Sequence, residues 1–249
     1  MSDLHLEMEG NRNYLQDNPP QVCGDILVLA GDIAYWGDER YGSYPFWDWA
    51  SSHYQQVIVG MGNHEFYNYY DLATMPNGFC HEIRPNVHVY YNAVVALQGI
   101  DIIVSTLWSK IPDKEAFFAE MFVTDFRRIK YQGELLTFVN FNQEHERCLS
   151  FVKEAVEKSG APKKIVVSHH VPSFLLQCPQ HQGSKLNGAF IVDLDHFIED
   201  SGVDYWIYGH SHYNKEAQIG RTLCVSNQLG YVHQNEHLSF RPSKFIELN

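Results

Sequence analysis

The chain has 249 residues, of which 45% are hydrophobic and 19% charged, and its formal net charge is −12 at pH 7. This length fits one large domain with a substantial core, and the acidic balance disfavours binding to long nucleic acid, which needs a basic surface. No apolar run approaches the roughly 20 residues of a membrane helix, and the N-terminus lacks a signal-like segment. We therefore expect no contact with a membrane.

The five cysteines are scattered and odd in number, and none has Cys-x-x-Cys spacing. This pattern argues against a disulfide framework or a thiolate zinc site and fits a reducing compartment. The sequence therefore predicts a cytoplasmic protein.

The first candidate site residues are Asp3 and His5. In an extended segment, side chains two positions apart point to the same side, so this pair could face one site. Taken alone, the pair is equally compatible with an exposed N-terminal loop.

Two buried strands are expected next, over 25–30 and 57–61, because both are continuous apolar runs. The first ends in Gly31-Asp32 and the second in Gly62-Asn63-His64-Glu65. Helical spacing over 45–54 places a helix between them, which predicts a βαβ unit. In open α/β sheets the crevice beyond the strand carboxyl ends is the usual ligand site.

The middle of the chain contains two expected excursions near the site, over about 66–92 and 109–140. The first is rich in aromatic residues and turns, and the second has no clean period. The strands expected in this part of the chain cover 87–91, 94–97 and 102–108. The connections between these strands are short, which favours antiparallel pairing.

The remaining expected elements include two more strands that end in imidazoles. A helix over 142–158 leads to a strand that ends in His169-His170-Val171-Pro172, and a run over 205–208 ends in Gly209-His210-Ser211-His212. A short helix near 192–198 and closing strands at 222–225 and 245–248 complete the chain. No linker or internal repeat is evident, so we expect a single domain over 1–249.

The residues at these strand ends are carboxylates, one amide and imidazoles, a mixture suited to borderline or hard divalent metals. One catalytic zinc needs about three protein ligands, so this larger set suggests two ions with a shared ligand. The plain alternative is a group of unrelated surface histidines. The candidates are Asp3, His5, Asp32, Asn63, His64, His170 or His169, His210 and His212.

These blocks, in this order, resemble the five motifs of the calcineurin-like metallophosphoesterase superfamily. The resemblance implies a four-layer α/β/β/α sandwich of two mixed sheets flanked by helices, with two divalent metals at the strand carboxyl ends. The metals would be Mn, Fe, Zn or Mg, with manganese the expected activator in vitro.

The resemblance also implies a role for each residue. Asp3, His5 and His212 would hold the first ion, and Asn63, His170 and His210 the second. Asp32 would bridge both, and His64 would act in catalysis without binding metal. His170 is preferred over His169 because the family's ligand here usually has proline two residues later.

One feature departs from the family pattern. The family places a strand before Asp-x-His, whereas only Met1-Ser2 precede Asp3. Either the numbered chain lacks its natural start or the sheet is one central strand short, which would weaken support for Asp3 and His5.

The implied function is a binuclear metal-dependent phosphohydrolase that cleaves phosphomonoesters or phosphodiesters by attack of a metal-bridging hydroxide. Its expected partner is a small phosphorylated substrate, and the sequence leaves the oligomeric state open. The alternative is an inactive scaffold protein of the same fold. The aromatic residues Tyr35, Trp36, Tyr67, Tyr69 and Trp108 could stack on a substrate or simply pack. Arg127 and Arg128 could bind a phosphate or form surface salt bridges.

Overall fold

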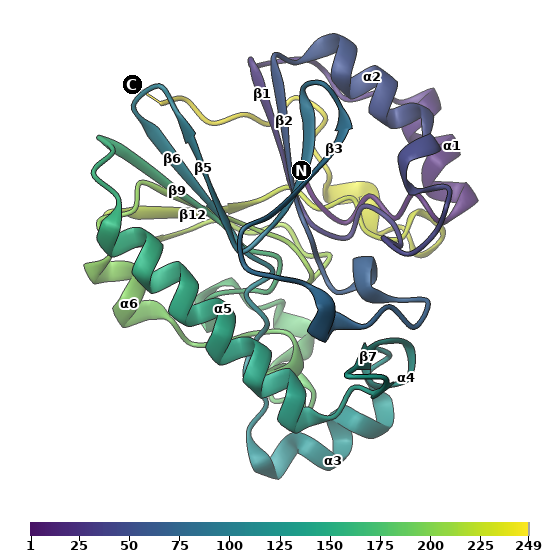
Figure 1. Cartoon of the computed structure of the whole chain (residues 1–249), viewed down its shortest axis with the longest axis vertical. Helices are drawn as coiled ribbons and strands as arrows, with labels where there is room; N and C mark the ends of the chain where they lie inside the picture. The colour runs from purple at the N-terminus through teal and green to yellow at the C-terminus, as the bar shows by residue number, and fades with distance from the viewer. Residues whose placement is uncertain (249) are drawn as a thin grey trace.

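The computed structural model describes residues 1–248 and contains two mixed β-sheets that face each other (Figure 1). The four-stranded sheet has the order β1 (Ile26–Ala30), β2 (Gln56–Gly60), β4 (Val87–Tyr91), β3 (Phe79–Arg84). The six-stranded sheet has the order β11 (Ala217–Ile219), β12 (Thr222–Ser226), β10 (Tyr205–Tyr208), β9 (Lys163–Val167), β6 (Ile100–Val104), β5 (Ala93–Leu97). A small hairpin joins β7 (Lys130–Tyr131) to β8 (Glu134–Leu135).

Helices cover the outer faces of both sheets, which confirms the predicted α/β/β/α arrangement. They are α1 (Glu9–Asp17), α2 (Pro45–His53), α3 (Asp113–Phe122), α4 (Asp125–Arg128), α5 (Phe138–Lys158) and α6 (Asp195–Asp200). Helix α2 packs on the four-stranded sheet, whereas α5 and α6 contact β6 and β11 of the other sheet. Within residues 1–248, every helix is too short or too polar to cross a membrane.

The central strands are buried on both faces. Ile58, Ile102 and Ile165 belong to a cluster between the two sheets, while their neighbours Val57, Ile103 and Val166 pack under the helices. Strands β1, β2 and β4 run parallel, as do β6, β9, β10 and β12. Parallel pairing brings the carboxyl ends of these strands to one edge of each sheet.

The N-terminal residues lie between the two sheets rather than in a full strand. The Met1 amino group donates to the Val28 carbonyl oxygen at 2.7 Å, and the Ala30 amide donates to Met1 O at 2.8 Å. On the other side, the Ser2 amide donates to Asn227 O at 3.1 Å. Asp3 is therefore held from both sheets by a very short extended segment.

Two local expectations differ from the structure. Strands β4 and β5 do not pair with each other, because the chain changes sheets at Asn92, whose φ is +45°. The Asn92 side chain donates to Asn77 Oδ1 and accepts from the Ser105 hydroxyl, which holds this turn. The segment 245–248 is not a strand, although Ile246 and Leu248 pack against the cluster between the sheets.

Candidate metal centre

Most of the candidate ligands follow the ends of β1, β2, β9 and β10, whereas Asp3 and His5 lie in the N-terminal segment. Together they lie at one edge of the sandwich. Five of them have a positive φ of 48° to 73°, namely Asp3, His5, Asp32, His210 and His212. This conformation is unfavourable for residues with a Cβ and costs on the order of 1–3 kcal/mol each. Such strain persists only where surrounding contacts hold the backbone in place, and here it turns side chains from different strands toward one another.

The glycines before these residues permit the close approach of two loops. A Cβ on Gly62 would lie 2.2 Å from Asp32 Oδ1 and 2.7 Å from the Asp32 backbone nitrogen. Gly31 has a φ of +87°, and a Cβ there would meet the Gly62 backbone nitrogen at 2.6 Å. Side chains at either position would therefore separate the loops that carry Asp32 and Asn63.

One group of candidate ligands combines Asp3 and His5 of the first motif with His212 of the last motif. His5 Nε2 lies 3.1 Å from His212 Nε2, and His212 Nε2 lies 3.4 Å from Asp3 Oδ1. The His210 amide also donates to Asp3 Oδ1 at 3.0 Å, so Asp3 is linked to the loop that carries both histidines. These three side chains can converge on a single cation.

A second group surrounds Asp32. His169 Nε2 lies 3.2 Å from Asp32 Oδ1 and 3.0 Å from Asn63 Oδ1. Ligand atoms of Asp32, His169 and His210 are close enough to share an ion, and Asp32 also approaches His5 and His64. Asp32 therefore lies between the two groups, where a bridging ligand would be needed.

The hydrogen bonds of the histidines determine which ring nitrogen can bind a metal. His5 Nδ1 lies 3.1 Å from Glu7 Oε1, and His212 Nδ1 lies 2.6 Å from Glu236 Oε2. His169 Nδ1 lies 2.9 Å from the Ala30 carbonyl oxygen. A neutral ring that donates from Nδ1 to such an acceptor has its lone pair on Nε2, the nitrogen that can then bind a cation.

His170 has the opposite arrangement. Its Nδ1 accepts the Ser109 amide proton at 3.1 Å. The neutral ring therefore carries its own proton on Nε2. That Nε2 is buried and has no hydrogen-bond partner within residues 1–248. The ring stacks on His210 with centroids 4.2 Å apart. The geometry therefore favours His169 over His170, which reverses the preference based on proline spacing.

His64 lies beside the proposed ligands. Its Nε2 is 4.0 Å from Asp32 Oδ2, and its Nδ1 is 3.1 Å from Glu7 Oε1. The ring stacks on Tyr67 with centroids 4.2 Å apart. One carboxylate, Glu7, therefore orients both His5 and His64.

Burial and neighbouring charged groups together determine the pKa values of the histidines. Burial lowers the pKa of His64, but Asp32 and Glu7 outweigh this effect and raise it above its usual value. Burial likewise opposes protonation of His212, yet its bonds to Asp3 and Glu236 raise its pKa to about 10. Burial and the nearby His169 lower the pKa of His210 to about 3. The site thus contains histidines of very different basicity.

Three further carboxylates in the site were not among the sequence candidates. Glu7 is two residues after His5, so the same spacing rule that linked Asp3 and His5 could have found it. Glu236 comes from the C-terminal segment and Asp125 from α4, and no local pattern marks either residue. Glu65 accepts hydrogen bonds from the backbone amides of Asp32, Ile33 and Gly62 at 2.6–3.0 Å and so holds the two ligand loops together.

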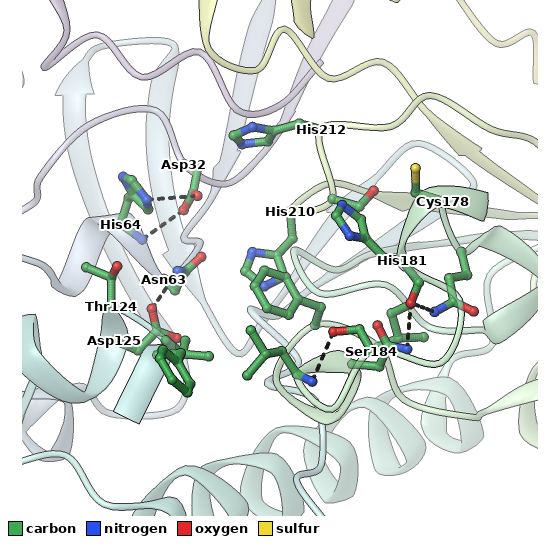
Figure 2. Close-up of a pocket in the computed structure, with 18 of the residues that line it drawn as sticks. Asp32, Asn63, His64, Thr124, Asp125, Cys178, His181, Ser184, His210 and His212 are labelled. Carbon is green, nitrogen blue, oxygen red and sulfur yellow. Dashed lines mark hydrogen bonds and ion pairs between the residues drawn. The ribbon is translucent and has the colours of Figure 1, made fainter. Parts of the chain in front are cut away.

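Asp125 links the segment 109–140 to the centre. Its Oδ1 accepts from Asn63 Nδ2 at 2.9 Å (Figure 2). The same oxygen accepts from the Tyr67 hydroxyl at 2.7 Å. The first bond fixes the amide so that Asn63 Oδ1 faces His169, and the second holds the ring that stacks on His64. Asp125 is only 1% exposed. The expected excursion therefore contributes a structural part of the centre.

The donor set fits two divalent cations. It consists of imidazole nitrogens and carboxylate or amide oxygens, with far nitrogens held by oxygen acceptors as in many metal sites. His5 Nε2 and His212 Nε2 face each other at 3.1 Å, an arrangement that a cation can satisfy with both lone pairs. Asp3, His5 and Asp32 are at most 2% exposed, so their polar atoms have little access to water.

The other candidate substrate contacts divide into pocket and non-pocket residues. Tyr67 lines the pocket beside the centre, whereas Trp108 is fully buried against Phe66 and Phe141. Trp36 packs on Tyr41, Phe79 and His81. Arg127 and Arg128 are exposed and do not line the pocket. Within residues 1–248 neither forms a salt bridge, and Arg127 donates to the Met121 carbonyl oxygen.

Comparison with known proteins gives a consistent result. An uncharacterized protein of Acanthamoeba polyphaga mimivirus is 28% identical over the whole of this chain and 95% of its own length. The crystal structure of phosphopantetheinyl hydrolase from Mycobacterium tuberculosis has the same fold, with a TM-score of 0.68 and 17% identity over 94% of this chain and 89% of that one. The family model of the calcineurin-like phosphoesterases matches residues 1–214. The chain therefore belongs to the calcineurin-like phosphoesterase family.

Proposed function

We propose that this protein is a phosphoesterase with two divalent metal ions, which hydrolyses phosphomonoesters or phosphodiesters. The observation that carries the proposal is the position of Asp32 between two groups of candidate ligands. Membership of the family supports metal-dependent phosphoester hydrolysis in general.

Asp3, His5 and His212 would hold one ion, and Asn63, His169 and His210 the other, with Asp32 shared. The tautomer argument supports His169 in this role, and His170 remains the alternative. When bound, two such cations supply charge stabilisation for a phosphoryl group and a hydroxide nucleophile near neutral pH. Mn, Fe, Zn and Mg are all compatible with this donor set, and we propose manganese as the activator in vitro.

His64 is the proposed general acid. Asp32 and Glu7 favour its protonated form, and the residue lines the pocket. From this position Nε2 can donate a proton to the oxygen of the departing alcohol. Tyr67 and Glu7 would hold the ring in place during this transfer.

We further propose a cytoplasmic location and a small phosphorylated substrate rather than long nucleic acid. The five free cysteines and the net charge of −12 support these two proposals. Fractionation of cells that produce a tagged full-length chain would test the first. Retention of the protein in a membrane or secreted fraction would contradict it.

The direct test is hydrolysis of bis(p-nitrophenyl) phosphate and p-nitrophenyl phosphate with added manganese. The wild-type protein should hydrolyse at least one of them, and Asp32→Asn should lower the rate by about 10²- to 10³-fold, the scale for loss of one strong electrostatic contact. Asp17→Asn, an exposed change on α1, is the matched control. Absence of metal-dependent hydrolysis, or equal rates for wild type and Asp32→Asn, would contradict the proposal and favour an inactive scaffold.

A further inference from the structure

A pocket of about 370 Å³ lies directly beside the candidate metal centre. Figure 2 shows that one side is formed by Asp32, Asn63 and His64, and the other by residues around Cys178–Ser184 and His210. This volume suits a small organic group. A substrate phosphate held at the centre would therefore place one of its ester groups in this pocket.

The walls of the pocket are mainly apolar. Phe122 and Val123 come from the end of α3, and Leu186, Phe190 and Ile191 come from the loop that follows β9. The Phe190 ring stacks on the candidate ligand His210, with centroids 4.7 Å apart and an interplanar angle of 19°. The apolar surface thus begins immediately next to the metal ligands.

Apart from the histidines, the charged residues in the lining are acidic. His64 and His212, whose pKa values are raised, belong to the candidate metal centre. Asp32, Asp125 and Glu236 line the pocket, whereas within residues 1–248 neither lysine nor arginine does. Lys185 lies between the lining residues Ser184 and Leu186 in the sequence but does not itself line the pocket. Its Nζ lies 4.3 Å from the centroid of the Phe118 ring.

Apolar walls without lysine or arginine disfavour a polyanionic substrate. A second phosphate, away from the bound cations, would enter a partly dehydrated space without an opposite charge, which is costly. An apolar group would instead leave water and contact Phe122, Phe190 and Ile191, which is favourable. The two effects act in the same direction.

We propose that the substrate carries a single phosphate group and that its alcohol part is uncharged and largely apolar, such as an alkyl or aryl group. This inference rests on the proposed phosphoesterase function and narrows its substrate class. It excludes nucleoside polyphosphates and other compounds with a second phosphate as preferred substrates.

The test uses pairs of substrates that differ only in a second phosphate. One pair is n-hexyl phosphate and 1,6-hexanediol bisphosphate, and the other is p-nitrophenyl hexyl phosphate with and without a terminal phosphate. For the manganese-loaded enzyme, kcat/KM should be at least about tenfold higher for the compound with one phosphate. Chain length should also matter, because each buried methylene is expected to raise kcat/KM by about fourfold from methyl to hexyl.

A pair of variants locates the effect in the pocket. Phe122→Lys places a cation in the lining, whereas Phe117→Lys makes the same change on the same helix outside it. Both side chains are mostly exposed, at 57% and 65%, so both variants should fold. Phe122→Lys should lower the preference for one phosphate and the dependence on chain length, and Phe117→Lys should change neither.

The outcomes separate this inference from the function on which it rests. If the enzyme hydrolyses these compounds but prefers bisphosphates, or shows no dependence on chain length, the inference is wrong and the phosphoesterase function stands. Equal effects of Phe122→Lys and Phe117→Lys would also contradict it. If no compound in either series is hydrolysed with metal, the proposed function itself fails.

Discussion

The metal centre and the pocket walls are built in different ways. Most of the candidate ligands follow buried strands, and five of the ligands have strained backbone conformations held by contacts from several loops. The walls come instead from the end of α3 and from a loop with short 3-10 turns, outside the two sheets. The difference indicates that the sheets determine the chemistry, whereas the connecting segments determine which substrate fits.

The contrast is not complete, because Asp125 belongs to a connecting segment and yet stabilises the metal centre through hydrogen bonds. Its bonds to Asn63 and Tyr67 tie α4 to the ligand set. The experiments below therefore separate three contributions: the catalytic group, the close packing of the ligand loops, and the hydrogen bonds from α4.

The largest effect is expected from His64→Gln. Loss of a general acid lowers kcat by about 10²- to 10⁴-fold, while bound metal should stay the same because His64 is not a proposed ligand. Measurement of kcat together with metal content by elemental analysis checks both parts. The ring also lies near Asp32 and His5, so a variant that loses an ion would show that His64 is a ligand.

A large effect on stability is expected from Gly62→Ala. The added Cβ would approach Asp32 Oδ1 to 2.2 Å and must displace backbone. Such overpacking costs about 1–3 kcal/mol, which thermal or urea unfolding would detect, and phosphoesterase activity should fall with it. Gly10→Ala is the matched control, because a Cβ there meets nothing within 4 Å. Similar stability of the two variants would contradict the packing argument.

A smaller effect is expected from Asp125→Ala. Loss of a residue that orients a ligand typically lowers metal affinity or activity by about 10- to 100-fold. Asn63 could then rotate its amide, and Tyr67 would lose its acceptor. Metal affinity should fall together with kcat, whereas Asp113→Ala, an exposed change on α3, should alter neither. If Asp125→Ala changed only KM, Asp125 would not orient the metal ligands, and α4 would contribute only to the pocket wall.

The pH dependence should differ between metal-free and metal-loaded protein. Folding raises the pKa of His212 from 6.5 to about 10 in the metal-free chain, since its bonds to Asp3 and Glu236 outweigh burial. The stability from this pairing is thus fully present below pH 6.5 and is lost as the pH rises toward 10. Metal binding must displace this proton, so manganese affinity should increase over the same range.

Calorimetric titrations with manganese in buffers of different ionisation enthalpy would count the protons released. Thermal unfolding of chelator-treated protein between pH 6.5 and 9 would follow the stability. A metal affinity that does not change with pH, or stability that increases over this range, would contradict the assigned pairing of His212.

Much of the fold could be predicted from the sequence because its signals are local. Continuous apolar runs marked β1, β2, β9 and β10, and each run ends in a residue of the candidate site. Helix α1 was not expected, since few apolar residues mark its buried face. The exchange of sheets at Asn92 depends on side-chain bonds to distant residues, which no local pattern encodes.

The candidate site was predictable only in part, because some of its contacts join residues that lie far apart in the sequence. Asp3, Asp32 and His210 follow recognisable motifs, but Asp125 meets Asn63 across 62 positions in the chain. The choice between His169 and His170 could not be made from spacing, because it depends on whether Nδ1 faces a carbonyl oxygen or an amide proton.

The most direct test of the account is the metal content of the purified protein after reconstitution with manganese. Wild type should hold two ions per chain by elemental analysis. His210→Ala and His212→Ala should each retain about one, since each is assigned to a different ion. A wild-type stoichiometry of one or none, or two variants that each keep both ions, would contradict a two-metal centre joined by this loop.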